Sequence, residues 1–247
     1  MDDLKKILKL VLISGNLKGI NPLSMLIVSK SGNGKTELIT SFKKKGVDFI
    51  TDMSYGGIVP WLAKDRSVRH IIVPDFIKIT EKKRTTTANL VSLLNALIEE
   101  GAGRFKVLGH EFDLKDRHIG LITATTKASF AQNKTKWESF GFVQRMIIVS
   151  FDYTDDTFNK IIESINKEEY LKVYREKLIV YGSNISTEEM FNKQLNKYIN
   201  KSFRGLKQLQ TLTKANALIE GRKKVNQSDV DEIIRLTKFM NLNYTKI

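Results

Sequence analysis

The stretch SKSGNGKT, residues 29–36, directly follows the compact apolar run SMLIVS at residues 24–29. It ends in glycine, lysine and threonine, as a phosphate-binding loop of the pattern G-x-x-x-x-G-K-[ST] does, but it begins with serine. A small residue is compatible with that first position if its φ is negative. Because backbone N–H groups between a buried strand and a helix can surround phosphate oxygens, the stretch predicts a nucleotide site. The alternative is a glycine-rich turn without a ligand.

Each part of this loop has an expected task in holding ATP and Mg²⁺. Gly32 and Gly34 allow the backbone to approach the phosphates closely. Lys35 would reach the β- and γ-phosphates, and the Thr36 hydroxyl would hold Mg²⁺. The predicted cofactor-binding segment consists of Ser29, Lys30, Ser31, Gly32, Asn33, Gly34, Lys35, Thr36 and Glu37.

A second acidic element follows another apolar run, HIIVPD at residues 70–75. Asp75, at the end of that run, can hold Mg²⁺ through water, so Thr36 and Asp75 are the predicted metal residues. An aspartate in an ordinary loop after a strand is the alternative. Phe76 follows where many hydrolases of this type carry a glutamate that activates water, which weakens the case for hydrolysis.

Apolar runs alternate with helical stretches over the first 150 residues, and this alternation predicts an α/β fold with a parallel sheet between helices. From Thr154 onward the periodicity is helical. We therefore expect a nucleotide-binding core over residues 1–151 and an all-helical domain over 152–247. Strands are expected at 24–29, 47–51, 69–76, 118–126 and 142–151, with a hairpin at 103–114 and helices at 2–12, 35–45 and 87–101. Later helices are expected to begin at capping boxes formed by Ser186 with Glu189 and by Ser228 with Asp231.

The composition favours an anionic partner. The 247 residues carry a formal net charge of +14, and nucleic acid fits that charge best. A lysine-rich composition typical of the source organism is the alternative. The chain has no cysteine, which excludes disulfides and thiolate metal sites, and its three histidines lack zinc-motif spacing, so no metal-ligand role is predicted for the histidines. No segment approaches the length of a membrane span, and the lysines of the N-terminus argue against a signal peptide, so a cytoplasmic protein is expected.

Further segments occur in a characteristic order after the loop. They are PDFIKI (74–79), NALIEEG (95–101), GRFKVLGHEFDLKDR (103–117), LITATT (121–126), GFVQRMIIVSF (141–151) and NKSFRGLKQLQTLTKANALIEGRKKVNQSDV (200–230). This order resembles AAA+ ATPases, and within them the minichromosome-maintenance helicases and related replication proteins of phages and plasmids. The resemblance implies a P-loop NTPase αβα sandwich with a C-terminal helical lid.

The resemblance also implies roles for four residues outside the loop. Thr125 takes the position of a polar sensor, where the family has asparagine. Arg145 matches an arginine finger that reaches a neighbouring subunit's γ-phosphate, and Arg204 matches the second sensor arginine. Glu99, or the adjacent Glu100, falls on a helix that carries a glutamate in the family. Together with Lys35 and Asp75, these residues are the predicted catalytic set; surface arginines and structural salt bridges are the alternatives.

In the family the hairpin projects into a central channel and touches DNA, and the subunits form a ring or spiral. The resemblance therefore implies a homo-oligomer that binds nucleic acid, with DNA favoured over RNA, through phosphate contacts that carry no sequence information. An ordinary solvated hairpin is the alternative. The predicted DNA-binding residues are Arg104, Lys106, His110, Lys115 and Arg117.

The leading hypothesis is an ATP hydrolase acting on DNA, as a replication initiator, helicase-like motor or loader of a mobile element. The second hypothesis is a nucleotide-gated switch that assembles on DNA with little or no hydrolysis. A small-molecule kinase is a third hypothesis, but a kinase would need an acceptor pocket and a short lid rather than a helical domain.

Overall fold

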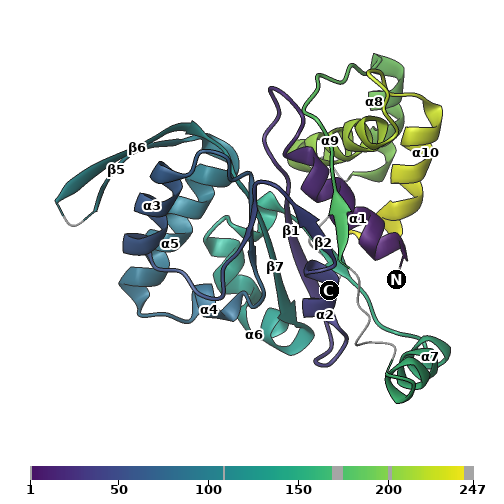
Figure 1. Ribbon diagram of the computed structural model, residues 1–247, viewed down its shortest axis with the longest axis horizontal. Helices are drawn as coiled ribbons and strands as arrows, with labels where there is room; N and C mark the ends of the chain where they lie inside the picture. The colour runs from purple at the N-terminus through teal and green to yellow at the C-terminus, as the bar shows by residue number, and fades with distance from the viewer. Residues whose placement is uncertain (1, 108, 169–174, 200–201, 242–247) are drawn as a thin grey trace.

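A five-stranded parallel sheet forms the centre of the computed structural model, which describes residues 2–107, 109–168, 175–199 and 202–241 (Figure 1). The strand order is β3-β4-β7-β1-β8, and every neighbouring pair is parallel. The strands are β1 (Ser24–Ser29), β3 (Val47–Phe49), β4 (His70–Val73), β7 (Gly120–Thr126) and β8 (Met146–Ser150). The structure confirms the α/β class and places a strand within each of the five expected segments.

Two hydrophobic cores cover the two faces of the sheet, and each central strand contributes to both. Met25 and Ile27 of β1 belong to the first core, whereas Leu26 and Val28 belong to the second. Successive side chains of a strand point to opposite faces, so an unbroken apolar run is what a strand covered on both sides requires. All six residues of β1 are buried.

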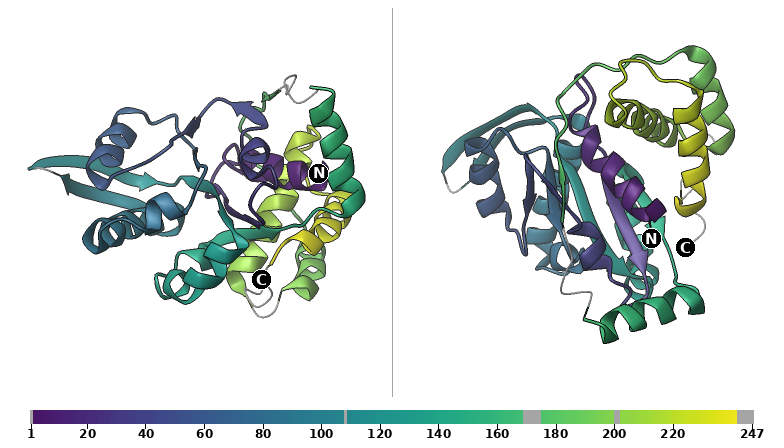
Figure 2. Two further views of the ribbon diagram at one scale, coloured as in Figure 1. Left: turned by 90° about the horizontal axis from the view of Figure 1, so that it is seen from below. Right: turned by 45° about the vertical axis from the view of Figure 1, so that its right-hand side comes forward.

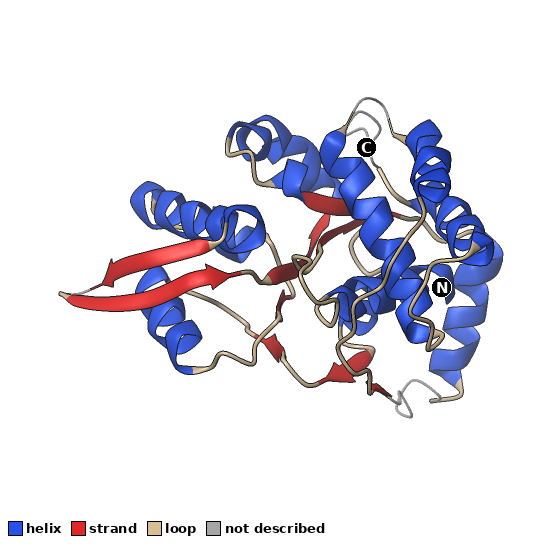
Figure 3. Ribbon diagram, turned by 90° about the horizontal axis from the view of Figure 1, so that it is seen from above, coloured by secondary structure: helices blue, strands red, loops and turns tan. Residues whose placement is uncertain are grey.

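Helices pack on both faces of the sheet (Figures 2 and 3). The first core contains residues of α1 (Asp2–Ser14), α2 (Lys35–Ile39), α8 (Glu189–Leu195), α9 (Phe203–Ile219) and α10 (Gln227–Leu236). The second contains residues of α3 (Tyr55–Lys64), α4 (Ile77–Thr80), α5 (Arg84–Asn95) and α6 (Lys127–Ser139). A π-helical turn, Ala96–Glu100, extends α5 to Gly101, near the predicted end of that helix.

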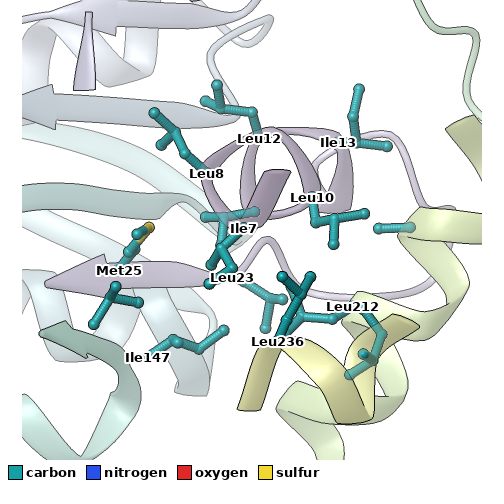
Figure 4. Packing of buried hydrophobic residues seen from close by; sticks show 14 of the residues in the cluster. Ile7, Leu8, Leu10, Leu12, Ile13, Leu23, Met25, Ile147, Leu212 and Leu236 are labelled. Carbon is teal, nitrogen blue, oxygen red and sulfur yellow. The ribbon is translucent and has the colours of Figure 1, made fainter. Parts of the chain in front are cut away.

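The first helix joins the sheet to the C-terminal helices. α1 carries its lysines before Leu10, whereas every residue from Leu10 to Ser14 is buried, as a helix end surrounded by other elements requires. Figure 4 shows its side chains between Met25 and Ile147 of the sheet and Leu212 and Leu236 of the C-terminal helices. One continuous core therefore spans both predicted domains, and the packing does not divide at residue 151.

The prediction of a helix over residues 35–45 is wrong beyond Ile39. The chain turns after α2 and enters a short strand, β2 (Phe42–Lys44), which pairs in parallel with β9 (Glu176–Leu178). β9 lies in the part of the chain that was expected to be entirely helical. Burial of Phe42 and Leu178 in the first core stabilises this pairing. Local periodicity cannot reveal a ladder between segments so far apart in sequence.

The two expected capping boxes are also wrong. Ser186 forms an isolated bridge with Lys224, and α8 begins only at Glu189. α10 begins two residues earlier than the Ser228 box predicts, because Asn226 caps it in a reciprocal box with Asp229. The Asp229 carboxylate is fully buried and also accepts a hydrogen bond from Asn216, which fixes the start of the helix.

Two elements stand out from the body of the molecule. The predicted hairpin is confirmed as β5 (Ala102–Val107) and β6 (His110–Arg117), and it projects well beyond the sheet (Figures 1 and 3). α7 (Asp155–Asn166) lies at the margin and has no buried residue (Figure 2). Three short 3-10 turns complete the described elements: Val143–Arg145, Asn196–Tyr198 and Thr237–Phe239. None of the described helices is long and apolar enough to cross a bilayer.

The position of α1 predicts a large stability effect for Ile7→Ala. Ile7 is completely buried, so the truncation leaves a cavity and should lower the free energy of unfolding by about 2–5 kcal/mol. Ile162→Ala on α7 is the matched control, because Ile162 is 40% exposed and should cost about 0.5 kcal/mol or less. Urea unfolding followed by circular dichroism measures both values. Equal losses would contradict the packing described for α1.

Candidate functional site

The loop after β1, Asp75 and Thr125 lie at the same edge of the sheet. Parallel strands bring their carboxyl ends together, and β7 lies between β1 and β4. Ser29 is paired with Thr126, and the backbone N–H of Phe76 donates to the carbonyl of Ala124 at 2.8 Å. Three segments that are distant in sequence therefore meet where the nucleotide site was predicted.

The loop has a conformation that requires its two glycines. Gly32 and Gly34 have φ values of 79° and 62°, which L-residues with a side chain rarely adopt. Ser29, in contrast, ends β1 as a completely buried residue with ordinary extended backbone. Its hydroxyl donates to the carbonyl of Lys30 at 3.3 Å. The serine at the first position of the motif is therefore accommodated without backbone strain.

Lys35 folds back over the loop. Its Nζ donates to the carbonyl oxygens of Lys30 at 2.7 Å and of Ser29 at 3.3 Å. Partial burial lowers the pKa of Lys35, while the nearby charge of Asp75 acts in the opposite direction. The ammonium group thus lies within electrostatic reach of the Asp75 carboxylate, as the two predicted roles require.

Thr125 carries a hydroxyl that lacks a partner. The residue is 3% exposed, and its Oγ1 has no hydrogen-bond partner among the described residues. A buried polar atom without a partner is costly, so this hydroxyl suits a site that a ligand or a water completes. On the neighbouring strand end, Asp75 uses Oδ1 to accept from the backbone N–H of Ile77 at 3.1 Å. The second carboxylate oxygen of Asp75 could therefore contact the water shell of Mg²⁺.

Tyr153 is a residue of this edge that the sequence analysis missed. Its hydroxyl donates to the carbonyl of Asn33 at 2.9 Å, which holds the middle of the loop from outside. Burial raises the pKa of Tyr153, and the charge of Glu37 adds to the effect. No local signal marks this tyrosine, because it follows β8 and reaches the loop only through the fold.

Phe76 belongs to the core and not to the site. It is completely buried, stacks on Phe142 with ring centroids 5.3 Å apart, and meets Trp137 edge to face at 4.7 Å. The position that carries a glutamate in many hydrolases thus points into the second core. A carboxylate there would need a new backbone direction as well as a new side chain.

Glu99, Arg145 and Arg204 lie together at the opposite edge of the sheet. Arg145 immediately precedes β8 and therefore lies at the amino end of that strand. Because β8 is parallel to β1, its carboxyl end, not its amino end, lies at the edge with the loop. The Glu99 carboxylate bridges the two arginines, with Arg145 Nε and Arg204 Nε each 2.7 Å from one of its oxygens. Glu99 therefore lies away from the loop of its own chain, and its predicted catalytic role stays a prediction.

The arginine cluster is held in place by several further contacts. Arg145 donates to the carbonyl of Gly141 at 2.5 Å and to Glu100 at 3.2 Å. Burial of the Glu99 carboxylate opposes its ionisation, but Arg204 and Arg145 outweigh that effect and lower the pKa of Glu99 below its usual value. A cavity of about 370 Å³ opens beside the cluster, between the start of β1 and α9.

The hairpin presents most of the predicted DNA-binding side chains to solvent, but not all of them. Arg104, Lys106, His110 and Lys115 are exposed, and Arg104 lies 3.5 Å from Glu111. Arg117 differs, because its guanidinium donates to the backbone carbonyls of Leu62, Asp65 and Val68. Arg117 thus links the base of the hairpin to the end of α3, which is a structural role.

Within the described ranges, no three histidine or acidic side chains come together in a way that could hold a metal ion. Thr36 is exposed at the start of α2, so Thr36 and Asp75 remain the two residues that could share Mg²⁺ with phosphate oxygens. No protein-family model matches the chain, and no curated protein matches it either.

The ion pairs of Glu99 predict a pH-dependent contribution to stability. Because the pKa of Glu99 is lowered in the folded state, the contribution is present at neutral pH and disappears as the pH falls through that lowered pKa. Glu99→Gln should lower the free energy of unfolding by about 1 kcal/mol at neutral pH, since both arginines lose their ion pair with Glu99. The difference from wild type should begin to shrink near the ordinary pKa of glutamate and vanish once the pH is below the lowered pKa of Glu99.

Urea unfolding at a series of pH values measures this difference. Glu188→Gln is the control, because Glu188 pairs with Lys224 in an exposed contact at 2.6 Å and should cost less than about 0.5 kcal/mol. A Glu99→Gln variant as stable as wild type at neutral pH would show that the cluster does not hold the two arginines.

Proposed function

We propose that this chain is a P-loop ATPase of the AAA+ type that acts on DNA and works as an oligomer. The observation that carries the proposal is the meeting of Lys35, Asp75 and the unpartnered hydroxyl of Thr125 at one edge of the sheet. Phosphoryl transfer from ATP needs a lysine, a carboxylate and a polar sensor, and here they come from the start of α2, the end of β4 and the end of β7. A helicase-like motor, a loader or a replication initiator would all use such a site.

In this proposal the loop backbone and Lys35 hold the phosphates, while Thr36 and Asp75 share Mg²⁺. Bound Mg²⁺ and ATP supply an electrophilic phosphoryl group with partly neutralised charge. Lys35 would exchange its two loop carbonyls for phosphate oxygens. Thr125 would orient water, and Tyr153 would keep the loop from collapsing by holding the Asn33 carbonyl.

A second copy of the chain completes the site in this proposal. Arg145 and Arg204 lie at the edge of the sheet opposite the loop, so neither can serve the nucleotide of its own chain. A head-to-tail contact would bring this edge of one copy to the loop edge of the next, and repeated contacts of that kind close into rings or grow into spirals. The arginines would then stabilise charge that develops on the transferred group.

A nucleotide-gated switch is the second candidate function, and Phe76 favours it. Phe76, a core aromatic residue, occupies the position best suited to a water-activating glutamate. Glu99 lies at the edge of the sheet opposite the loop. In this alternative, ATP would drive assembly on DNA, and turnover would fall far below about 1 s⁻¹, the low end of typical enzymes. ATP turnover measured with and without DNA separates the two candidates.

Lys35→Ala should abolish nucleotide binding at the loop. Loss of the ammonium removes the main charged contact to the phosphates, so affinity for a fluorescent ATP analogue should fall about tenfold or more. Lys64→Ala, at the exposed end of α3, removes the same charge away from the loop and should bind as wild type does. Unchanged affinity in Lys35→Ala would remove the basis of the proposal.

Arg145→Ala should retain ATP binding and lose turnover, because the arginine acts on a neighbouring copy. Mixing Arg145→Ala with Lys35→Ala should restore part of the activity, since intact loops then meet intact arginines. The measurement is ATP turnover at a protein concentration that allows assembly, with each variant alone as the control. A mixture no more active than its components would argue against a site shared between copies.

A further inference from the structure

A second cavity, of about 850 Å³, lies beside the β2–β9 ladder and far along the chain from the hairpin. That volume falls within the range of small-molecule sites, about 300–1,000 Å³. Its walls are β2, the segment from Lys177 to Tyr181 and the turn after α1, and Arg69 lies at its base. In Figure 1, β2 lies next to α1, whereas the hairpin points away from this region.

The residues that line the cavity carry positive charge that no acidic lining residue among those described balances. The cationic lining residues are Lys43, Lys44, Lys45, Arg69 and Lys177. Lys43 lies directly opposite Lys177 in the β2–β9 ladder, where two like charges repel. Such a concentration of cations favours a bound anion.

Lys44 is the most confined of these cations. Burial lowers the pKa of Lys44 to about 8, and repulsion from the neighbouring Arg69 adds to the effect. Burial alone also lowers the pKa of Arg69, which donates from Nε to the carbonyl of Gly15 at 3.1 Å. An anion placed between these groups would relieve both the desolvation and the repulsion.

The walls of the cavity are fixed by hydrogen bonds between distant segments. Asn16 Nδ2 donates to the carbonyl of Val180 at 2.7 Å, and the N–H of Lys18 donates to the carbonyl of Ser183 at 3.1 Å. The N–H of Ser183 returns a bond to the carbonyl of Asn16 at 3.2 Å. The cationic groups are therefore held by an ordered frame, which lowers the entropic cost of binding.

An aromatic side chain stands at the rim of the cavity. Tyr181 is 85% exposed, and Ile179, two residues before it, is 66% exposed. Large apolar side chains beside a cluster of lysines are the arrangement by which proteins bind single nucleic-acid strands: bases stack on the aromatic ring, and phosphates contact the cations. A purely inorganic anion would leave this apolar rim without a role.

We propose that the basic groove formed by Lys43, Lys44, Lys45, Arg69, Lys177 and Tyr181 binds a nucleotide unit of a single nucleic-acid strand. The lysines contact its phosphates, and Tyr181 stacks on a base. The inference rests on the nucleic-acid part of the proposed function and adds a contact surface separate from the hairpin. It does not depend on ATP binding at the loop.

The test is binding of a labelled single-stranded oligonucleotide by fluorescence anisotropy at several salt concentrations. Lys43→Gln with Lys177→Gln should weaken binding about tenfold at moderate salt and lower the salt slope by about 0.7 per lost contact. Lys160→Gln with Lys193→Gln removes the same charge from exposed pairs on α7 and α8, and it should bind as wild type does. Equal losses in the two double variants would overturn the groove as a defined site.

Tyr181→Ala provides a second, independent test, because this substitution leaves the charge of the groove unchanged. Loss of stacking should weaken binding about fivefold or more, whereas Tyr181→Phe should retain it. Because Tyr181 is exposed, neither change should affect folding, and thermal unfolding checks this. Unchanged binding in Tyr181→Ala and in the Lys43 and Lys177 variant would overturn the inference and direct attention to the hairpin.

The wild-type protein separates failure of the inference from failure of the proposed function. A wild type that binds no oligonucleotide would overturn both the groove and the action on DNA, while ATP binding would still be judged by Lys35→Ala. Unlabelled competitors distinguish the two sources of phosphate. If ATP or inorganic triphosphate displaces the labelled strand with the same efficiency as an unlabelled oligonucleotide, the groove binds free phosphates and the inference is overturned. Displacement by the oligonucleotide alone would support it.

Discussion

The parallel direction of all five strands is the constraint on which the rest of the structure depends. Parallel strands place every carboxyl end at one edge of the sheet and every amino end at the other. The insertion of β7 between β1 and β4 then sets Thr125 between the glycine-rich loop and Asp75. The same direction puts Arg145 at the start of β8, on the far edge. The candidate site and the arginine cluster are thus consequences of one topology.

The loop lies at the carboxyl ends of the strands and the arginine cluster at their amino ends. Under the proposed function, these two edges would face each other in a head-to-tail assembly. Within one copy, Glu99 holds Arg145 and Arg204 in fixed positions and neutralises part of their charge. A bound triphosphate of another copy could compete with Glu99 for the arginines, because phosphate and carboxylate accept the same bidentate donors. Under the proposed function, Glu99 would then keep the arginines ordered until a neighbouring nucleotide arrives, which differs from the catalytic role predicted from the sequence.

Sequence patterns predicted the sheet well because buried parallel strands are short apolar runs, as SMLIVS in β1 illustrates. The loop was equally visible, since its glycines and its lysine are fixed by local chemistry. What escaped prediction depends on contacts between distant segments. The β2–β9 ladder, the Tyr153 bond to the loop and the three carbonyls around Arg117 all join residues that no local period connects. The pairing of Glu99 with Arg145 and Arg204 escaped prediction for the same reason.

Phe76 shows how the packing of the core limits the chemistry that this site can perform. Its ring fills the space between Phe142 and Trp137, so the backbone after Asp75 turns inward where a water-activating carboxylate would have to point outward. Asp75 is the acidic group whose charge acts on Lys35 at this edge, and sharing Mg²⁺ would occupy it. Under the proposed function, hydrolysis would draw its remaining charge stabilisation from Arg145 and Arg204 of another copy. A protein built in this way would couple turnover to assembly, whichever of the two candidate functions it performs.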